Sequence, residues 1–278
     1  MSVFVKKADS TDEAFDEEKV IRTCIRMGAT REVAEIIANR IESKIYNGIE
    51  TKKILKMIFR FLSKYKPSVK HHIDLRRALS LLKSKPDFEL FIQILFKEYD
   101  YDVLKNQIVK GKCVEHEVDG IAKKNDRTFI IEAKHHFDYH TPVGLDVSRI
   151  SRAVFEDVTE GFELGLNKFR IDSSIIVSNT KLSGHARRYA DCRGIKHMCW
   201  NSSHEFDLQS MIKEKKLYPI TYLKGLKTPV REKLVSAGVL FLKDLIKKSA
   251  KTLSKETGVP IETISSLINK AKMILLES

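Results

Sequence analysis

The sequence predicts an α+β fold, in which a mixed central sheet with an α/β core is flanked by two small helical domains. Three observations predict this fold. Apolar residues near both ends of the chain recur at helical spacing, whereas the short apolar runs typical of strands lie in the middle. In that middle part a helix precedes three closely spaced strands, and helices alternate with two further strands after them. A length of 278 residues is sufficient for about two or three domains.

The composition indicates a soluble globular protein with a polyanionic partner. Hydrophobic residues make up 42% and charged residues 31% of the chain, as in folded soluble domains. No apolar run approaches the roughly 18 residues that span a bilayer, and no signal peptide is evident, so we expect no membrane partner. Four scattered cysteines without a CxxC pair favour free thiols in the cytoplasm. The net charge of +13 favours nucleic acid.

The first part of the chain, residues 1–66, is predicted to be a small helical domain. Asp16 is a candidate N-cap for its first helix, which an apolar stripe then follows. The same spacing predicts a second helix over residues 31–45 and a third that begins at Thr51. Residues 67–85 are predicted to form a linker helix.

The second part, residues 86–204, is predicted to be the central α+β domain. Its first helix, over residues 87–99, has apolar side chains on one face and is therefore expected to pack on the sheet. Short polar turns separate the strands that follow. The expected strands span residues 102–108, 112–122, 128–134, 173–177 and 195–200, and the later helices span 148–165 and 184–193. The third part, residues 217–278, is predicted to be helical with two glycine-containing turns.

Two carboxylates and a lysine are expected to meet on the second and third of these strands. Asn125-Asp126-Arg127 is typical of a hairpin turn, which would place Asp119 beside Glu132. Because side chains alternate across a strand, Glu132 and Lys134 share one face. Two carboxylates with a cation beside them form a candidate Mg²⁺ site, and such a site suits phosphodiester hydrolysis.

A lone Glu-x-Lys in a strand more often marks an exposed edge with a cross-strand ion pair. Here Phe129-Ile130-Ile131 is apolar throughout, which indicates a central strand. A charged pair on a buried strand needs a partner, and a metal ion would supply one. On the preceding helix Glu89 and Gln93 lie one turn apart, where both could border the site.

Over residues 86–200 the chain resembles the PD-(D/E)xK nuclease superfamily, and within it the Mrr-like restriction endonucleases. The resemblance is carried by Phe88-Glu89, Tyr101-Asp102-Val103, His116-Glu117-Val118-Asp119 and Ile131-Glu132-Ala133-Lys134. It implies a restriction-endonuclease-like fold and a DNA endonuclease that depends on Mg²⁺ or Mn²⁺. The chain departs from the family at Glu115-His116-Glu117, where a run of glycines is common.

The resemblance also implies roles for the site residues. Asp119, Glu132 and the main chain at Ala133 match the metal-binding positions. Lys134 matches the lysine that orients or activates water, and Glu89 matches the acid of the first helix.

Four further residues are accessory candidates. Glu117 could supply a second metal ligand, as could Glu115, for which a solvated rim charge is the alternative, and Gln93 could border the site. His135 and His136 follow the lysine and could reach the scissile phosphate or assist proton transfer. The alternative is that both histidines belong to a polar loop at the edge of the sheet.

The N-terminal part resembles the ATP-cone, a small regulatory module that binds adenine nucleotides. The matching segments are Val5-Lys6-Lys7, Phe15-Asp16, Lys19, residues 33–45 and Thr51. The resemblance implies that ATP or dATP acts as an effector and is bound by Lys6, Lys7, Phe15, Lys19 and Thr51. The family's tight Asp-Gly turn is absent, because residues 8–13 stand there instead. The alternative is a helical spacer or dimer surface with solvated lysines.

The C-terminal part resembles tandem helix-hairpin-helix modules, which bind DNA phosphates through backbone N–H groups without reading sequence. Three glycine-containing segments carry the likeness, at Gly225, Gly238 and Gly258, and the resemblance implies that Lys251 and Lys255 assist them. The family's second hairpin glycine is replaced by Pro260, which leaves a protein-binding or dimerising role open.

Taken together, these patterns predict a cytoplasmic, Mg²⁺-dependent DNA endonuclease that an adenine nucleotide regulates and that forms a homodimer or higher oligomer. One alternative is a nucleotide-sensing DNA-binding protein with an inactive nuclease fold. The presence of Asp119, Glu132 and Lys134 together argues against it. Another alternative is a nuclease selective for DNA junctions or flaps, and the sequence does not separate it from a restriction enzyme.

Overall fold

In the computed structural model, residues 3–7, 10–200, 202 and 207–277 are described. The chain forms two compact units. The first contains Met1–Ile73, Leu223–Lys233 and Leu245–Ser278, and the second contains Asp74–Tyr222 and Leu234–Asp244. The domain boundaries expected at residues 66, 85, 204 and 217 remain predictions, and residue 204 lies outside the described residues.

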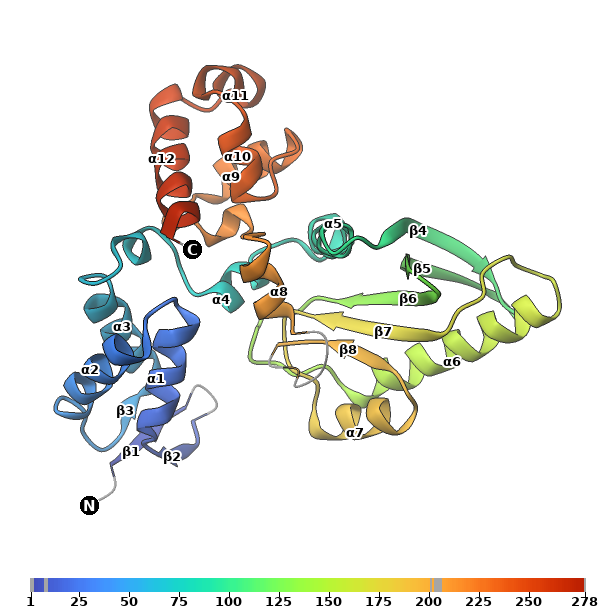
Figure 1. Ribbon diagram of the computed structural model, residues 1–278, viewed down its shortest axis with the longest axis horizontal. Coiled ribbons are helices and arrows are strands. Elements are labelled where there is room, and N and C mark those ends of the chain that lie inside the picture. The colour runs from blue at the N-terminus through green and yellow to red at the C-terminus, as the bar shows by residue number, and fades with distance from the viewer. Residues whose placement is uncertain (1–2, 8–9, 201, 203–206, 278) are drawn as a thin grey trace. The chain divides into compact units, whose positions relative to one another are not determined.

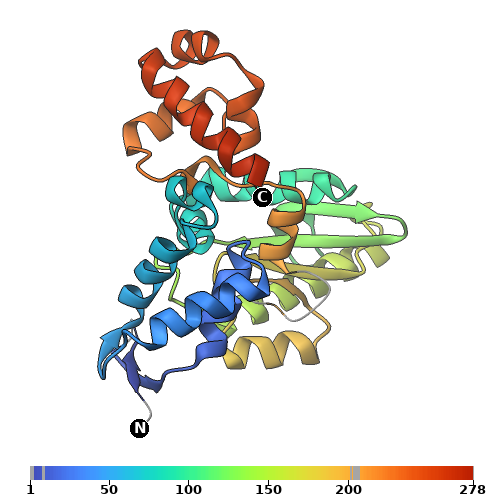
Figure 2. The same cartoon turned by 60° about the vertical axis from the view of Figure 1, so that its left-hand side comes forward.

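The N-terminal part combines three helices with a small three-stranded sheet of order β2-β1-β3 (Figures 1 and 2). Strand β1 pairs antiparallel with β2 and parallel with β3. A core that includes Val5, Ile37 and Leu62 joins the sheet to the helices. The elements are β1 (Phe4–Lys6), β2 (Asp12–Ala14), α1 (Glu17–Arg26), α2 (Arg31–Glu42), β3 (Ile49–Glu50) and α3 (Thr51–Leu62).

The second unit is built on a five-stranded mixed sheet of order β4-β5-β6-β7-β8 (Figure 1). Strand β5 pairs antiparallel with both β4 and β6, whereas β6, β7 and β8 run parallel. The mixed sheet and the α+β class are therefore confirmed, and β6 is central as its apolar sequence predicted. The strands are β4 (Asp102–Lys110), β5 (Glu115–Lys124), β6 (Arg127–Lys134), β7 (Ser173–Ser178) and β8 (Lys196–Met198).

Helices α5 (Glu89–Glu98) and α6 (Leu145–Glu163) cover opposite faces of this sheet (Figure 1). Ile130 of β6 packs in a cluster with Val158 of α6. Its neighbour Phe129 points the other way, because side chains alternate along a strand. There the ring of Tyr101 lies 6.4 Å from Phe129 and 5.1 Å from Phe96 of α5. The other helices before β8 are α4 (Leu75–Ser80) and α7 (Gly184–Cys192).

The alternation of side chains is interrupted at Asn106 and Asp119, which lie opposite each other in β4 and β5. The register pairs the residues on either side of them, Lys105 with Gly120 and Gln107 with Val118. Val118 and Ile121 belong to the same core cluster although they are three positions apart, so β5 changes face between them. Asn106 has a φ of 44°, a left-handed conformation that is uncommon outside glycine. Asp119 therefore stands where the strand changes face.

The C-terminal part consists of short helices connected by glycine turns. Gly238 and Gly258 have φ values of 78° and 63°, which a side chain would strain. The last helix packs on the 3₁₀ turn η1 (Pro67–His71) of the same unit, where Ser68 N donates to Glu277 Oε2 at 3.0 Å. The helices that follow β8 along the chain are α8 (Leu208–Glu214), α9 (Thr228–Ser236), α10 (Leu242–Lys247), α11 (Ala250–Thr257) and α12 (Ile261–Glu277).

Several predicted elements differ from the structure in their extent. Strand β5 begins at Glu115 and not at residue 112, because the Asp157 carboxylate accepts the main-chain N–H groups of Cys113 and Val114 and fixes a bend there. The predicted linker helix is divided into η1 and α4. Asp16 is the N-cap of α1, but its side chain makes no capping bond and instead pairs with Arg22 at 3.7 Å.

Candidate active site

Asp119 and Glu132 lie side by side where the ladder between β5 and β6 ends. The last ladder pair is Gly120 with Ile131, so the next position on each strand belongs to one of the two acids. Asp119 Oδ2 accepts the main-chain N–H of Ala133 at 2.7 Å. The hairpin expected from the sequence turns at Asn125, whose φ is 54°, and it brings the two carboxylates together.

The first turn of α5 adds a third carboxylate. Glu89 begins this helix, and its side chain is 6% exposed. Asn106 Nδ2 donates to Glu89 Oε2 at 3.4 Å. Gln93 Nε2 donates to Asn106 Oδ1 at 2.9 Å and to the main-chain oxygen of Asp119 at 2.8 Å. Gln93 and Asn106 thus connect the helix to the site, and Asn106 was not found from the sequence.

The electrostatics of the acids favour a bound cation. Burial raises the pKa of Asp119, and the charge of Glu89 raises it further, against a lowering by the Ala133 N–H group. Burial also raises the pKa of Glu132, and the charge of Asp119 adds to that increase. Neighbouring buried carboxylates that destabilise one another are stabilised in their charged form by a nearby positive charge.

Lys85 supplies such a charge in the structure. Its Nζ lies 3.1 Å from Glu89 Oε1, 3.6 Å from Glu117 Oε1 and 3.8 Å from Asp119 Oδ1. The hydrogen bond to Glu89 raises the pKa of Lys85 above its usual value. Lys85 was not found from the sequence, although its position four residues before Glu89 is a spacing at which opposite charges meet.

Lys134 lies at the exposed end of β6, opposite Ser178 of β7. Its positive charge lowers the pKa of Glu132, against the larger effect of burial, so the lysine is within electrostatic reach of the acids. Lys134 and Lys85 approach the acids from different elements, one from β6 and one from the turn before α5.

Of the two histidines after Lys134, His135 has a ring that contacts protein groups outside the acidic cluster. His135 Nε2 lies 3.1 Å from the main-chain oxygen of Leu79, and its ring is 5.1 Å from Phe88. His136 N donates to Asn179 Oδ1 at 2.9 Å, and burial lowers the pKa of its ring. These contacts favour the structural alternative for His135.

The acids fit a hard divalent cation by their chemistry. Carboxylate oxygens are the ligands that Mg²⁺ prefers, and an ammonium group already lies among them. Within the described residues no group of three or more His, Cys, Asp or Glu side chains is arranged closely enough to hold a metal.

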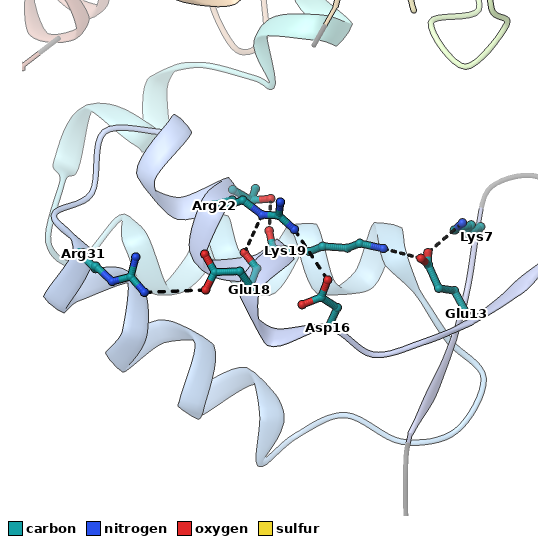
Figure 3. A network of polar contacts seen from close by, with 8 residues as sticks. Lys7, Glu13, Asp16, Glu18, Lys19, Arg22 and Arg31 are labelled. Atoms are coloured by element: carbon teal, nitrogen blue, oxygen red, sulfur yellow. Dashed lines mark hydrogen bonds and ion pairs between the residues drawn. The ribbon is translucent and has the colours of Figure 1, made fainter. Parts of the chain in front are cut away.

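The predicted nucleotide-binding lysines are joined by an acid. Glu13 of the β1–β2 hairpin pairs with Lys7 at 2.8 Å and also with Lys19 of α1 (Figure 3). Hydrogen bonds from Lys19 and Lys7 lower the pKa of Glu13 to about 2. Lys6 lies elsewhere, paired across the sheet with Asp12 and Glu50. Phe15 packs against the core, and Thr51 is the first residue of α3.

The predicted DNA-binding glycines adopt the backbone that their turns require. Gly225 has a φ of 80°, in the same left-handed region as Gly238 and Gly258. Lys251 and Lys255 are exposed one turn apart on α11. Beside them lies a hollow of about 380 Å³ whose lining includes Lys247, Lys248 and Lys272. The exposed lysines of α11 and of this hollow make the surface around them positively charged and accessible.

In the described residues no helix is long and apolar enough to cross a membrane.

Comparisons with known proteins find matches to two families within the chain. Residues 82–200 match the restriction endonuclease family, and residues 218–275 match the family described as AF1548-like, C-terminal. An uncharacterized protein of Archaeoglobus fulgidus is 32% identical over 183 residues, which are 65% of this chain and 98% of the relative. The solved structure of a protein of unknown function, AF1548, matches with a TM-score of 0.55 and 28% identity, over 74% of this chain and 100% of that one.

Proposed function

This chain belongs to the same protein family as its Archaeoglobus fulgidus relative, and on that premise and its restriction endonuclease domain we propose that it is a Mg²⁺-dependent DNA endonuclease. The observation that carries the proposal is the meeting of Asp119, Glu132 and Glu89 where the β5–β6 ladder ends. Burial raises the pKa values of Asp119 and Glu132 near a lysine, an arrangement that is typical of catalytic sites.

Each residue has a role in this proposal. A bound Mg²⁺ lowers the pKa of water and neutralises charge on the phosphate. Asp119 and Glu132 hold the metal with the main chain at Ala133, whose N–H group orients the Asp119 carboxylate. Lys134, exposed at the end of β6, orients the attacking water. Glu89 adds a negative charge from α5. Gln93 holds α5 against β5 through its hydrogen bond to the main-chain oxygen of Asp119.

The direct test is incubation of plasmid, single-stranded and branched DNA with the full chain and Mg²⁺. We expect cleavage with Mg²⁺ or Mn²⁺, none with EDTA, and binding without cleavage in Ca²⁺. The Asp119→Ala variant should bind DNA and leave it intact. Cleavage of branched DNA alone would identify a junction or flap nuclease. DNA binding without cleavage under any metal would identify an inactive nuclease fold.

We also propose that the N-terminal part is an ATP-cone-like module whose adenine nucleotide regulates the enzyme. The support is the small sheet whose strand β1 ends at Lys6, with Lys7 directly after it and joined through Glu13 to Lys19 of α1. Phosphates are bound by such lysines through charge-assisted hydrogen bonds.

We propose that the protein is cytoplasmic, and its free cysteines agree with a reducing compartment.

For the C-terminal part we propose helix-hairpin-helix-like binding of DNA phosphates. The Lys251→Ala, Lys255→Ala double variant should raise the Kd for DNA several-fold. It should also flatten the slope of log K against log salt by about one unit for each phosphate that is no longer bound. The Lys44→Ala, Lys52→Ala variant removes the same charge from exposed positions in the N-terminal part and is the matched control. Equal salt slopes for both variants would favour a protein-binding role.

A further inference from the structure

Lys85 has no role in the proposed reaction, although it lies among the acids of the active site. Its ammonium group lies within 4 Å of three different carboxylates, on α5 and β5. Two of these acids are largely buried, since the side chains of Glu89 and Asp119 are 6% and 13% exposed. The lysine side chain itself is 63% exposed.

Burial makes a counter-charge necessary at this point. A buried carboxylate without a partner is costly, and a second carboxylate beside it adds repulsion. Gln93 and Asn106 donate hydrogen bonds to the main chain of Asp119 and to Glu89, but neither carries a charge. The positive charge of Lys85 reaches both acids directly.

The position of Lys85 allows its side chain to move away from the acids. Lys85 has an extended backbone, with φ −122° and ψ 136°, in the turn before α5. Its exposed stem can rotate toward solvent without moving the helix, because a long lysine side chain has several rotatable bonds. A divalent cation bound by Asp119 would need the carboxylate oxygen that faces the ammonium group, and two cations so close together would repel each other.

We propose that Lys85 is the resident counter-cation of this acidic cluster, which holds the acids in place before the metal arrives and is displaced when the metal binds. The inference rests on the proposed metal site. It makes Lys85 a positioning residue and a competitor of the metal, so that binding of the divalent ion and release of the lysine are one event.

The test measures metal binding rather than cleavage. Mn²⁺ is titrated by calorimetry into the full chain, without DNA, for the wild type, Lys85→Gln, Lys85→Arg and Asp119→Asn. We expect Lys85→Gln to tighten the Kd for Mn²⁺ about tenfold, because the competing charge is gone. Lys85→Arg keeps the charge and should stay close to wild type. Lys97→Gln removes an exposed lysine of α5 and should change nothing.

Thermal unfolding gives a second measurement that also reports folding. In EDTA, Lys85→Gln should unfold at a lower temperature than wild type, and excess Mn²⁺ should raise its Tm by more than it raises that of wild type.

The outcomes separate the two ideas. An unchanged or weaker Kd for Lys85→Gln, with metal binding lost in Asp119→Asn, overturns the role of Lys85 and leaves the metal site standing. Absence of Mn²⁺ binding in wild type, or equal binding by wild type and Asp119→Asn, overturns the metal site and the role of Lys85 with it.

Discussion

The acidic cluster of the sheet and the lysine network of the N-terminal part share one arrangement. In each, the groups predicted to bind a ligand already surround a residue of opposite charge. Lys85 lies among Glu89 and Asp119, and Glu13 lies between Lys7 and Lys19 (Figure 3). The arrangements differ in burial and in the direction of the pKa shifts.

The negative charge of the buried acids is only partly balanced by the nearby lysine, whereas the negative charge of exposed Glu13 is well balanced by its two lysines. Burial raises the pKa of Asp119 in spite of the nearby ammonium group, and the lysines lower the pKa of Glu13 to about 2. Exposed ion pairs contribute only about 0–1 kcal/mol to stability, so little holds the N-terminal network in one state. A raised pKa of an acid therefore marks a place that still favours an added cation. A lowered one marks a place that is already satisfied.

The largest expected effect concerns Lys134, the exposed lysine next to the buried acids of the active site. Lys134→Ala should lower the rate of cleavage by about a thousandfold or more, because the charge that orients the water is lost. Metal binding by this variant should stay near wild type, because Lys134 is not placed among the metal ligands. Plasmid cleavage and Mn²⁺ calorimetry measure the two quantities.

Lys123→Ala, at an exposed lysine of β5, is the control for this variant. A Lys134→Ala enzyme that cuts at the wild-type rate would remove the lysine from the mechanism.

The second effect tests the cost of the buried charge. Because its pKa is raised in the fold, ionised Asp119 destabilises the protein as the pH rises through that value. In EDTA at pH 8, Asp119→Asn should therefore be more stable than wild type by about 1 kcal/mol, or roughly 2–4 °C in Tm. Below the ordinary aspartate pKa of about 3.9 the wild-type carboxyl is neutral, and the difference should vanish.

Thermal unfolding at both pH values measures this effect, with Asp126→Asn in the exposed hairpin turn as the control. If Asp119→Asn were the less stable protein at pH 8, the acids would not be under the strain that burial implies.

The smallest effect concerns the exposed network. Glu13→Gln should leave the free energy of unfolding close to that of wild type, because exposed ion pairs contribute little to stability. It should tighten binding of ATP about threefold, since Lys7 and Lys19 no longer pair with the Glu13 carboxylate and can meet phosphate. Calorimetry with ATP measures the binding, and Glu32→Gln on α2 serves as the matched change of charge. Absence of ATP binding in wild type and variant alike would leave the module as a scaffold.

Local patterns sufficed for the order of elements around the site. The apolar run Phe129-Ile130-Ile131 predicted a central strand, and β6 is the middle strand of the sheet. The polar turn at Asn125 predicted the hairpin that brings Asp119 to Glu132. These features depend on neighbours in the sequence, which periodicity and turn chemistry describe directly. The roles of the site residues stay predictions.

Features that depend on distant contacts were not predictable. Asn106 adopts a positive φ in the middle of a strand, and strand alternation gives no sign of it. Lys85 approaches Asp119 only because α5 and β5 pack together. The short strands β1, β2 and β3 have two or three residues each, too few for a period to be recognised. Glu13 meets its two lysines through the same small sheet.

The packing of α12 on η1 has a consequence for how the protein is synthesised. Ser68 and the Glu277 side chain that accepts its N–H group are 209 residues apart in sequence. The ribosome therefore releases η1 long before it makes the helix that covers it, while the N-terminal sheet and helices can already fold. At about 5–20 residues per second this interval lasts roughly 10–40 seconds. During that time the side of Pro67–His71 that packs on α12 is open to chaperones and proteases, and a chain that stops before α12 leaves that side open permanently.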